Sequence, residues 1–265
     1  MKLELDFEKS VEENASKYFE QSKKAKRKLV GLEKAIEETK KKLAKQQKTQ
    51  VEKPVLEKKK KKEWFESFRW FYSSDGFLVV SGRSAKSNEQ IVKKYLDKED
   101  FFLHADISGG AVTIIKTAGK RIPEKTFQEA AQFAAVFSRA WKNSLATIDV
   151  YAVEASQVSK SAPTGTSLAA GSFMISGKRK YLKKTPLKLA IGLAKSNNQL
   201  LVGPFSAIKT KVAKPLELRQ GSGTAANTAK EILEILKAHS KNLVQVSVDE
   251  IVSAIPGENV ELKKE

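Results

Sequence analysis

The chain has 265 residues, of which 40% are hydrophobic, so it can bury at least one core. Lysine and arginine total 49 against 31 aspartates and glutamates, and the net charge of +18 predicts a polyanionic partner, either nucleic acid or an anionic membrane surface. No apolar run is long enough to span a bilayer, and the N-terminus MKLELDFEKS lacks a signal-peptide core, so we expect a cytoplasmic protein without a membrane partner. The lack of cysteine excludes disulfides and thiolate metal sites.

Residues 9–48 are predicted to form one long helix, the main part of a coiled-coil region over residues 1–50. Apolar or small residues recur at alternating steps of three and four, which is the spacing of a coiled-coil seam. The seam consists of Ala15, Tyr18, Ser22, Ala25, Leu29, Leu32, Ile36, Thr39 and Leu43. Such a seam requires a partner helix, from another chain, from a second copy or from another part of the same protein. The alternative is a single solvated helix rich in lysine and glutamate.

Residues 51–62 form a basic linker in which Pro54 ends the helix, and a globular pattern begins at Glu63. Strands are predicted at 68–73, 77–82, 101–105, 111–116, 147–153, 172–176, 187–193, 199–202 and 207–212, and helices at 87–96, 123–139, 225–239 and 249–255. The interleaving predicts an α/β or α+β mixed-sheet domain after the long coiled-coil helix. Residues 63–185 are its nucleus, and residues 186–265 are a C-terminal α/β extension or subdomain.

The segment Lys58–Asn88 brings cations, aromatic rings and a turn together in KKKKKEWFESFRWFYSSDGFLVVSGRSAKSN. Phosphates attract cations and unstacked bases attract flat rings, so this composition suits a nucleic-acid surface. Dense aromatics are more often core, however, and we expect alternate rings to be buried in the first strand. Ser84 or Ser87 is predicted to cap the next helix, where Arg83 either completes an anion site or lies beside a plain N-cap.

The segment FLHADISGGA places His104 and Asp106 two residues apart on a strand before a glycine turn. A histidine beside a carboxylate can act as a general base or contact a phosphate. We expect instead a polar pair that hydrogen-bonds across the loop, because no nucleophile or metal ligand lies nearby. HExxH, CxxC, GxxxxGK[ST], GxGxxG and GxSxG patterns are also missing, so we expect no enzyme activity, no metal and no cofactor.

The segment VSKSAPTGTSLAAGSFMISGKRK combines a Pro-Thr-Gly turn with a basic cluster. Six basic residues and no acidic residue lie in 176–188. Backbone N–H groups of the loop beside Lys160, Lys178 and Arg179 would contact phosphates. The alternative is an ordinary surface loop followed by a solvated run of charge.

Together, the three segments resemble the NFACT-R domain, the C-terminal RNA-binding domain of NFACT proteins, over about residues 60–185, and an archaeal member is expected. The upstream helix resembles the second arm of the antiparallel coiled coil that precedes this domain. The resemblance implies a ribosome quality-control factor that binds obstructed large subunits carrying peptidyl-tRNA, recruits tRNA and supports untemplated C-terminal tailing. The ribosome supplies the catalysis, so this chain would be a binding factor whose partners are tRNA, the large subunit and the N-terminal NFACT half or another helix.

The chain departs from the family pattern in two motifs. Ser81-Gly82-Arg83-Ser84 stands where the family has Gly-Gly-Arg-Asp, and residues 163–168 read PTGTSL where it has PTGEYL. The N-terminal NFACT and helix-hairpin-helix regions are missing, so we expect a C-terminal half. The residues predicted to contact RNA are Arg83, Lys86, His104, Lys116, Lys160, Thr164, Lys178 and Arg179. Two alternatives remain: a coiled-coil protein-interaction scaffold with an incidental basic surface, and a nucleic-acid-processing enzyme that uses His104 and Asp106.

Overall fold

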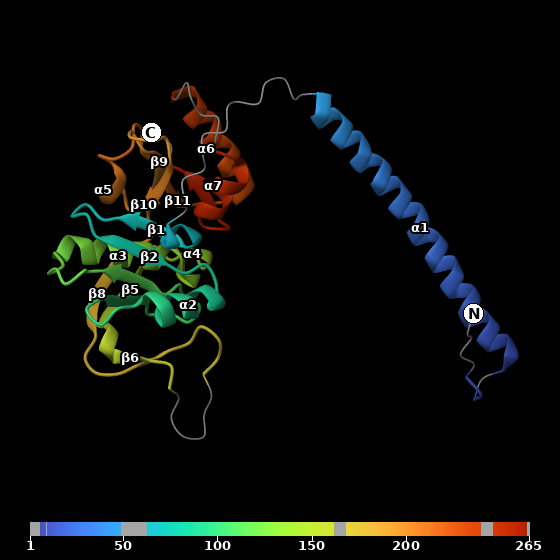
Figure 1. Ribbon diagram of the computed structural model, residues 1–265, viewed down its shortest axis with the longest axis horizontal. Coiled ribbons are helices and arrows are strands. Elements are labelled where there is room, and N and C mark those ends of the chain that lie inside the picture. The colour runs from blue at the N-terminus through green and yellow to red at the C-terminus, as the bar shows by residue number, and fades with distance from the viewer. Residues whose placement is uncertain (1–5, 9, 49–62, 162–167, 240–245, 264–265) are drawn as a thin grey trace. The chain divides into compact units, whose positions relative to one another are not determined.

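The computed structural model describes residues 6–8, 10–48, 63–161, 168–239 and 246–263, and the side chains of all of these except 41–48 (Figure 1). It divides into two compact units, Met1–Lys61 and Lys62–Glu265. In the first unit, α1 spans Val11–Lys48 and confirms the predicted helix. Ser10 and Glu13 form a capping box, in which the Ser10 hydroxyl accepts from the Glu13 N–H and the Glu13 carboxylate accepts from the Ser10 N–H.

The second unit contains a six-stranded sheet with the order β1-β2-β4-β3-β5-β8, in which every neighbouring pair is antiparallel. The strands are β1 (Arg69–Tyr72), β2 (Leu78–Ser81), β3 (Phe101–Ala105), β4 (Thr113–Lys116), β5 (Thr147–Glu154) and β8 (Lys180–Pro186). The predicted turn at Asp75-Gly76 connects β1 to β2, and Gly76 there has a φ of 86°, which favours glycine. Between β5 and β8, the strands β6 (Val158–Ser159) and β7 (Met174–Ile175) form a separate two-stranded antiparallel sheet.

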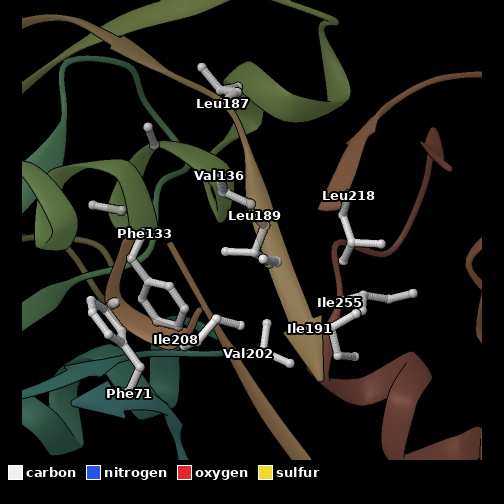
Figure 2. Packing of buried hydrophobic residues seen from close by; sticks show 14 of the residues in the cluster. Phe71, Phe133, Val136, Leu187, Leu189, Ile191, Val202, Ile208, Leu218 and Ile255 are labelled. Atoms are coloured by element: carbon white, nitrogen blue, oxygen red, sulfur yellow. The ribbon is translucent and has the colours of Figure 1, made fainter. Parts of the chain in front are cut away.

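One face of this sheet is covered by α3 (Glu124–Val136), which is followed by the short helix α4 (Arg139–Lys142). Ala130, Ala131 and Ala134 are fully buried, so the helix backbone approaches β3 and β5 closely. Phe133 of α3 meets Phe71 of β1 with ring centroids 4.8 Å apart (Figure 2). Pro123 is the N-cap of α3 rather than its first helical residue.

The opposite face carries a smaller cluster under the 3₁₀ helix η1 (Trp64–Ser67) and α2 (Ala85–Tyr95). Phe68 and Ile91 are buried there, and Trp64 stacks on Tyr95 with centroids 4.1 Å apart. The prediction that most rings of the first aromatic segment are core is therefore confirmed, with Tyr72 as the exposed exception.

A second sheet has the order β10-β9-β11-β12 and lies beside β1 on the side away from β8 (Figure 1). Its elements are β9 (Leu189–Leu193), β10 (Leu200–Gly203), α5 (Phe205–Ile208), β11 (Leu216–Gln220), α6 (Ala225–His239), α7 (Val248–Ala254) and β12 (Val260–Leu262). Leu189 and Leu218 of this part belong to the same buried cluster as Phe133 and Val136 of α3 (Figure 2). Residues on both sides of position 185 thus share one core.

The expected fold class is confirmed as helices with antiparallel sheets behind a long N-terminal helix. The strand predicted at 207–212 is wrong, because Pro204 begins the helical turn α5 and only Val212 makes a bridge, to Ala194. The strand predicted at 172–176 shortens to Met174–Ile175. Strand β8 escaped prediction because lysines occupy most of its outward positions, while Leu182 and Thr185 point inward.

Candidate nucleic-acid interface

A cavity of about 520 Å³ opens where three segments predicted to contact RNA meet. Its walls come from 82–88 at the start of α2, from 102–111 around the end of β3, and from 170–175 before and along β7. Arg69, Phe137 and Tyr151 complete the lining. We call this cavity the arginine pocket. The sheet register brings the segments together, since Ser81 of β2 pairs with Thr113 of β4 and Leu103 of β3 pairs with the same Thr113.

Two arginines supply the charge of the arginine pocket. Arg69 donates from Nη1 to the carbonyl of Gly82 at 2.9 Å, and its guanidinium carbon lies 4.3 Å from the centroid of Phe137. Arg83 donates from Nη2 to the carbonyl of Phe68 at 3.1 Å. Among the described residues neither guanidinium forms an ion pair with a carboxylate.

Burial, with the nearby Arg83 as a second cause, lowers the pKa of Arg69 to about 10. Arg69 remains charged at neutral pH, because this pKa still lies well above 7. The Nε of Arg69 is also buried without a hydrogen-bond partner in the described structure. Two like charges held together without a carboxylate favour an incoming anion, which would lower their repulsion and satisfy their free donors.

At the start of α2, Ser84 is the N-cap, one of the two predicted candidates, and Ser87 is the third helical residue of a capping box with it. The Ser84 hydroxyl accepts from the N–H of Ser87 at 3.3 Å, and the Ser87 hydroxyl accepts from the N–H groups of Arg83 at 2.7 Å and Ser84 at 2.8 Å. These serines satisfy the backbone N–H groups of Arg83, Ser84 and Ser87 internally. The arginine side chains supply the full positive charges at this edge of the pocket.

His104 lies on the floor of the pocket, with both ring nitrogens facing backbone carbonyls. Nδ1 is 2.6 Å from the carbonyl oxygen of Ala105, and Nε2 is 3.3 Å from that of Gly110. The prediction that His104 and Asp106 form a polar pair is wrong, because Asp106 is exposed. The contact of His104 across the loop is with the carbonyl of Gly110. Burial lowers the pKa of His104, so the neutral imidazole is favoured.

A salt link closes the third wall of the pocket. Lys160 forms an ion pair with Glu89 of α2, and the Glu89 carboxylate also accepts from the N–H of Gly171 at 3.1 Å. Gly171 has a φ of 79°, and a Cβ there would lie 2.8 Å from the Cα of Ala85, so only glycine fits without strain. Lys160 thus holds the loop on α2, and its charge is already compensated.

The other predicted RNA contacts are dispersed. Arg179 lies over the ring of Tyr151 at 4.7 Å, next to the pocket. Lys86 and Lys178 are exposed, on α2 and before β8 respectively. Lys116 does not line the pocket and forms ion pairs with Asp97 and Asp100. Thr164 lies outside the described residues.

Sequence reasoning missed Arg69, Phe137 and Tyr151 as lining residues. Arg69 was visible as the one cation inside the aromatic run, yet its sequence neighbours suggested core. Phe137 ends a helix and Tyr151 lies in an apolar strand, so neither position carried a local sign of a site. Their roles depend on which strands are neighbours in the sheet.

Residues 67–177 match the family described as NFACT protein RNA binding domain. The archaeal Rqc2 homolog aRqcH of Methanocaldococcus jannaschii is 36% identical over 208 residues, which are 78% of this chain and 30% of that protein. The ribosome quality control complex subunit NEMF homolog of Drosophila melanogaster is 37% identical over 196 residues, 72% of this chain and 20% of its own length. NEMF of Homo sapiens is 38% identical over 181 residues, 66% of this chain and 17% of its own length.

The chain therefore spans 30% or less of the length of these relatives. The solved C-terminal part of the fibronectin/fibrinogen-binding protein from Streptococcus suis aligns with 67% of this chain and 77% of its own at 22% identity, with a TM-score of 0.39 that is too low to support a conclusion. In the part of the chain that the structure describes, no helix is long and apolar enough to cross a membrane. The expected resemblance is confirmed: through residues 67–177 this chain belongs to the family of proteins that carry the NFACT RNA-binding domain.

Proposed function

We propose that this chain binds RNA, namely tRNA, large-subunit rRNA or both, through the arginine pocket, as part of a ribosome quality-control factor. The arginine pair Arg69 and Arg83 carries the proposal, because it holds two charges without a carboxylate at the mouth of a cavity. Relatives named for ribosome quality control support the cellular role. In that role the chain recognises obstructed large subunits that carry peptidyl-tRNA and supports untemplated tailing of the stalled chain.

The pocket has the chemistry that RNA requires. Guanidinium groups contact phosphate oxygens with two parallel donors, and Phe137 and Tyr151, each with an arginine over its ring, line the same cavity. A volume of about 520 Å³ is within the range of pockets that enclose a ligand of nucleotide size. The net charge of +18 would add long-range attraction for the rest of the polyanion.

The test is a titration of labelled tRNA with the 265-residue chain at several salt concentrations. We expect affinity to fall steeply as salt rises, because each phosphate contact releases a condensed counterion. Arg83→Ala should weaken binding about tenfold and reduce the salt slope by about one contact. Arg121→Ala, an exposed arginine outside the pocket, is the matched control and should change neither quantity. Equal effects of the two substitutions, or binding that salt does not change, would contradict the proposal.

The proposal assigns no catalytic step to this chain. Both ring nitrogens of His104, the candidate base, lie at backbone carbonyls, and neither lies at a carboxylate. Labelled tRNA incubated with the chain and divalent metal ions should stay intact. Cleavage that His104→Ala abolishes would replace the binding proposal with the enzymatic alternative.

A second function has its own support in α1. Leu29, Leu32 and Ile36 of the predicted seam are 58%, 59% and 53% exposed. Apolar residues at this spacing and exposure favour pairing with another helix, so we propose that α1 also holds a protein partner or the N-terminal half of an NFACT protein. Sedimentation tests this: a self-pairing helix gives a dimer that Leu32→Lys dissolves, whereas a monomer that captures a separately supplied partner helix supports the heterologous pairing.

A further inference from the structure

A row of rings crosses three adjacent strands on the sheet face opposite α3. His104 of β3 is the register partner of Tyr151 of β5, and Tyr151 is the partner of Tyr181 of β8. Ring centroids are 6.0 Å apart in the first pair and 6.3 Å apart in the second. We call these three residues the aromatic row. It begins on the floor of the arginine pocket and ends on an edge strand, where Tyr181 is 43% exposed.

Strand β8 alternates between the two faces as far as Leu182, and this determines what surrounds the outer end of the row. Lys180 and Leu182 turn toward α3, since Lys180 lies 3.8 Å over the ring of Phe127 and Leu182 is in the main core. Arg179 and Tyr181 therefore belong to the opposite face. Lys183 is exposed beside them, at a register shift between the buried residues Leu182 and Thr185. A cation, an aromatic ring and a second cation follow one another along this edge.

The cations on this face differ from their neighbours on the other. Lys180 is paired with Glu124 at 2.6 Å. Among the described residues neither Arg179 nor Lys183 forms an ion pair, and the guanidinium of Arg179 lies 4.7 Å from the centroid of Tyr151. On the inner part of the same face, Phe173 packs on Phe102, with ring centroids 6.0 Å apart. The outer part thus combines unpaired charge with exposed flat surfaces.

We propose that the aromatic row is a stacking platform for unpaired bases of single-stranded RNA, which rests on the proposed RNA-binding function and specifies its ligand. One base stacks on Tyr181, and the guanidinium plane of Arg179, supported by Tyr151, offers a second flat surface. Arg179 and Lys183 contact the phosphates between these bases. The RNA strand then continues into the arginine pocket, where Arg83 contacts a further phosphate.

This arrangement distinguishes single strands from duplexes. Bases inside a duplex are stacked on each other and show only their edges, so they cannot cover the ring of Tyr181. Ring stacking also accepts any base, because every base has a flat face. The platform should therefore select RNA by its lack of pairing and show little sequence preference.

The test compares three labelled RNAs of equal length at one salt concentration: an unstructured single strand, the same strand without bases, and a duplex. Tyr181→Ala should weaken binding of the single strand by about five- to a hundredfold, the range expected for the loss of one stacked base. It should leave binding of the baseless strand and the duplex unchanged. Tyr181→Phe keeps the ring and should bind as the original chain does.

Tyr72→Ala is the matched control, because Tyr72 is 41% exposed and also meets neighbouring rings, but lies on β1 outside the row. Its effect should stay within about twofold. If Tyr181→Ala does not fold, Tyr181→Leu, which keeps apolar surface without a ring, takes its place. The inference is overturned if Tyr181 and Tyr72 substitutions act alike, or if the loss is equal on the baseless strand; RNA binding that still depends on Arg83 then leaves the proposed function standing. A chain that binds none of the RNAs overturns both, and tight capture of a protein by the intact row would point to a protein partner.

Discussion

Two regions of the first sheet contain partly buried cations, and the regions differ in whether a carboxylate pairs with the cation. At one end of β4, Lys116 meets the carboxylates of Asp97 and Asp100, and Asp100 is only 2% exposed. At the other end, Arg69 and Arg83 share a pocket and donate only to backbone carbonyls. A cation that is paired with a carboxylate stabilises the fold, whereas two neighbouring cations without a carboxylate can attract an anionic ligand. The presence or absence of a carboxylate therefore separates the structural cation from the candidate RNA contact.

The largest expected effect is on the compensated side. Asp100→Ala should lower the free energy of unfolding by about 3–5 kcal/mol, because it leaves the Lys116 ammonium buried without its closest counterion. The Asp100 carboxylate also accepts from the N–H of Thr117 at 2.9 Å, and that donor loses its partner too. Denaturant unfolding measures the change. Asp97→Ala is the control: its carboxylate is 79% exposed, so less than about 1 kcal/mol should be lost.

The next effect belongs to the uncompensated side. Arg69→Met should weaken tRNA binding about tenfold, since a charge-assisted hydrogen bond to phosphate contributes about 1.5–3 kcal/mol. It should change the free energy of unfolding by less than about 1 kcal/mol, because the lost bond to Gly82 is offset by relief of repulsion from Arg83. Binding titrations and unfolding curves of the same preparation measure both. A large loss of stability with unchanged binding would make Arg69 a structural residue.

Lys116→Met tests the residue that the sequence predicted as an RNA contact and that the structure places in an ion pair. We expect tRNA affinity within about twofold of the original chain, because the ammonium charge is already compensated. The free energy of unfolding should fall by about 1–3 kcal/mol, less than for Asp100→Ala, since Asp100 keeps two backbone donors, Thr117 and Asp97. A loss of affinity equal to that of Arg69→Met would remove the distinction between the two regions.

The smallest effect concerns pH. Because burial lowers the pKa of His104, the unfolded chain binds more protons than the folded chain below about pH 6.5, the usual pKa of histidine. The stability contributed by the neutral ring is present above that pH and is lost as the pH falls toward the lower pKa of the folded state. Between about pH 8 and 5, the free energy of unfolding should therefore fall less steeply with decreasing pH for His104→Gln than for the original chain, as measured by denaturant unfolding at each pH. Identical slopes would show that His104 does not titrate differently on folding.

Local pattern was enough to predict the elements that carry the site. The helix start at Ser84, the strand before His104 and the tight loop at Gly110 all have short-range causes, namely capping, alternation and glycine turns. The ion pairs of Lys116 could not be predicted, because they depend on β4 lying beside β3 and on the loop that carries Asp97. Tyr181 was missed for a different reason, since its strand looks like a solvated run of lysines until its edge position is known.

The core shared across position 185 has a consequence for how such chains are cut. A fragment that ends where the family match ends, at residue 177, would lack Leu189 and Ile191, which belong to the same buried cluster as Phe133 of α3. The indole of Trp141 also donates to the carbonyl of Glu258 at 2.9 Å, which ties the segment before β12 to α4. The segment that matches the RNA-binding family is thus shorter than the segment that shares its buried core.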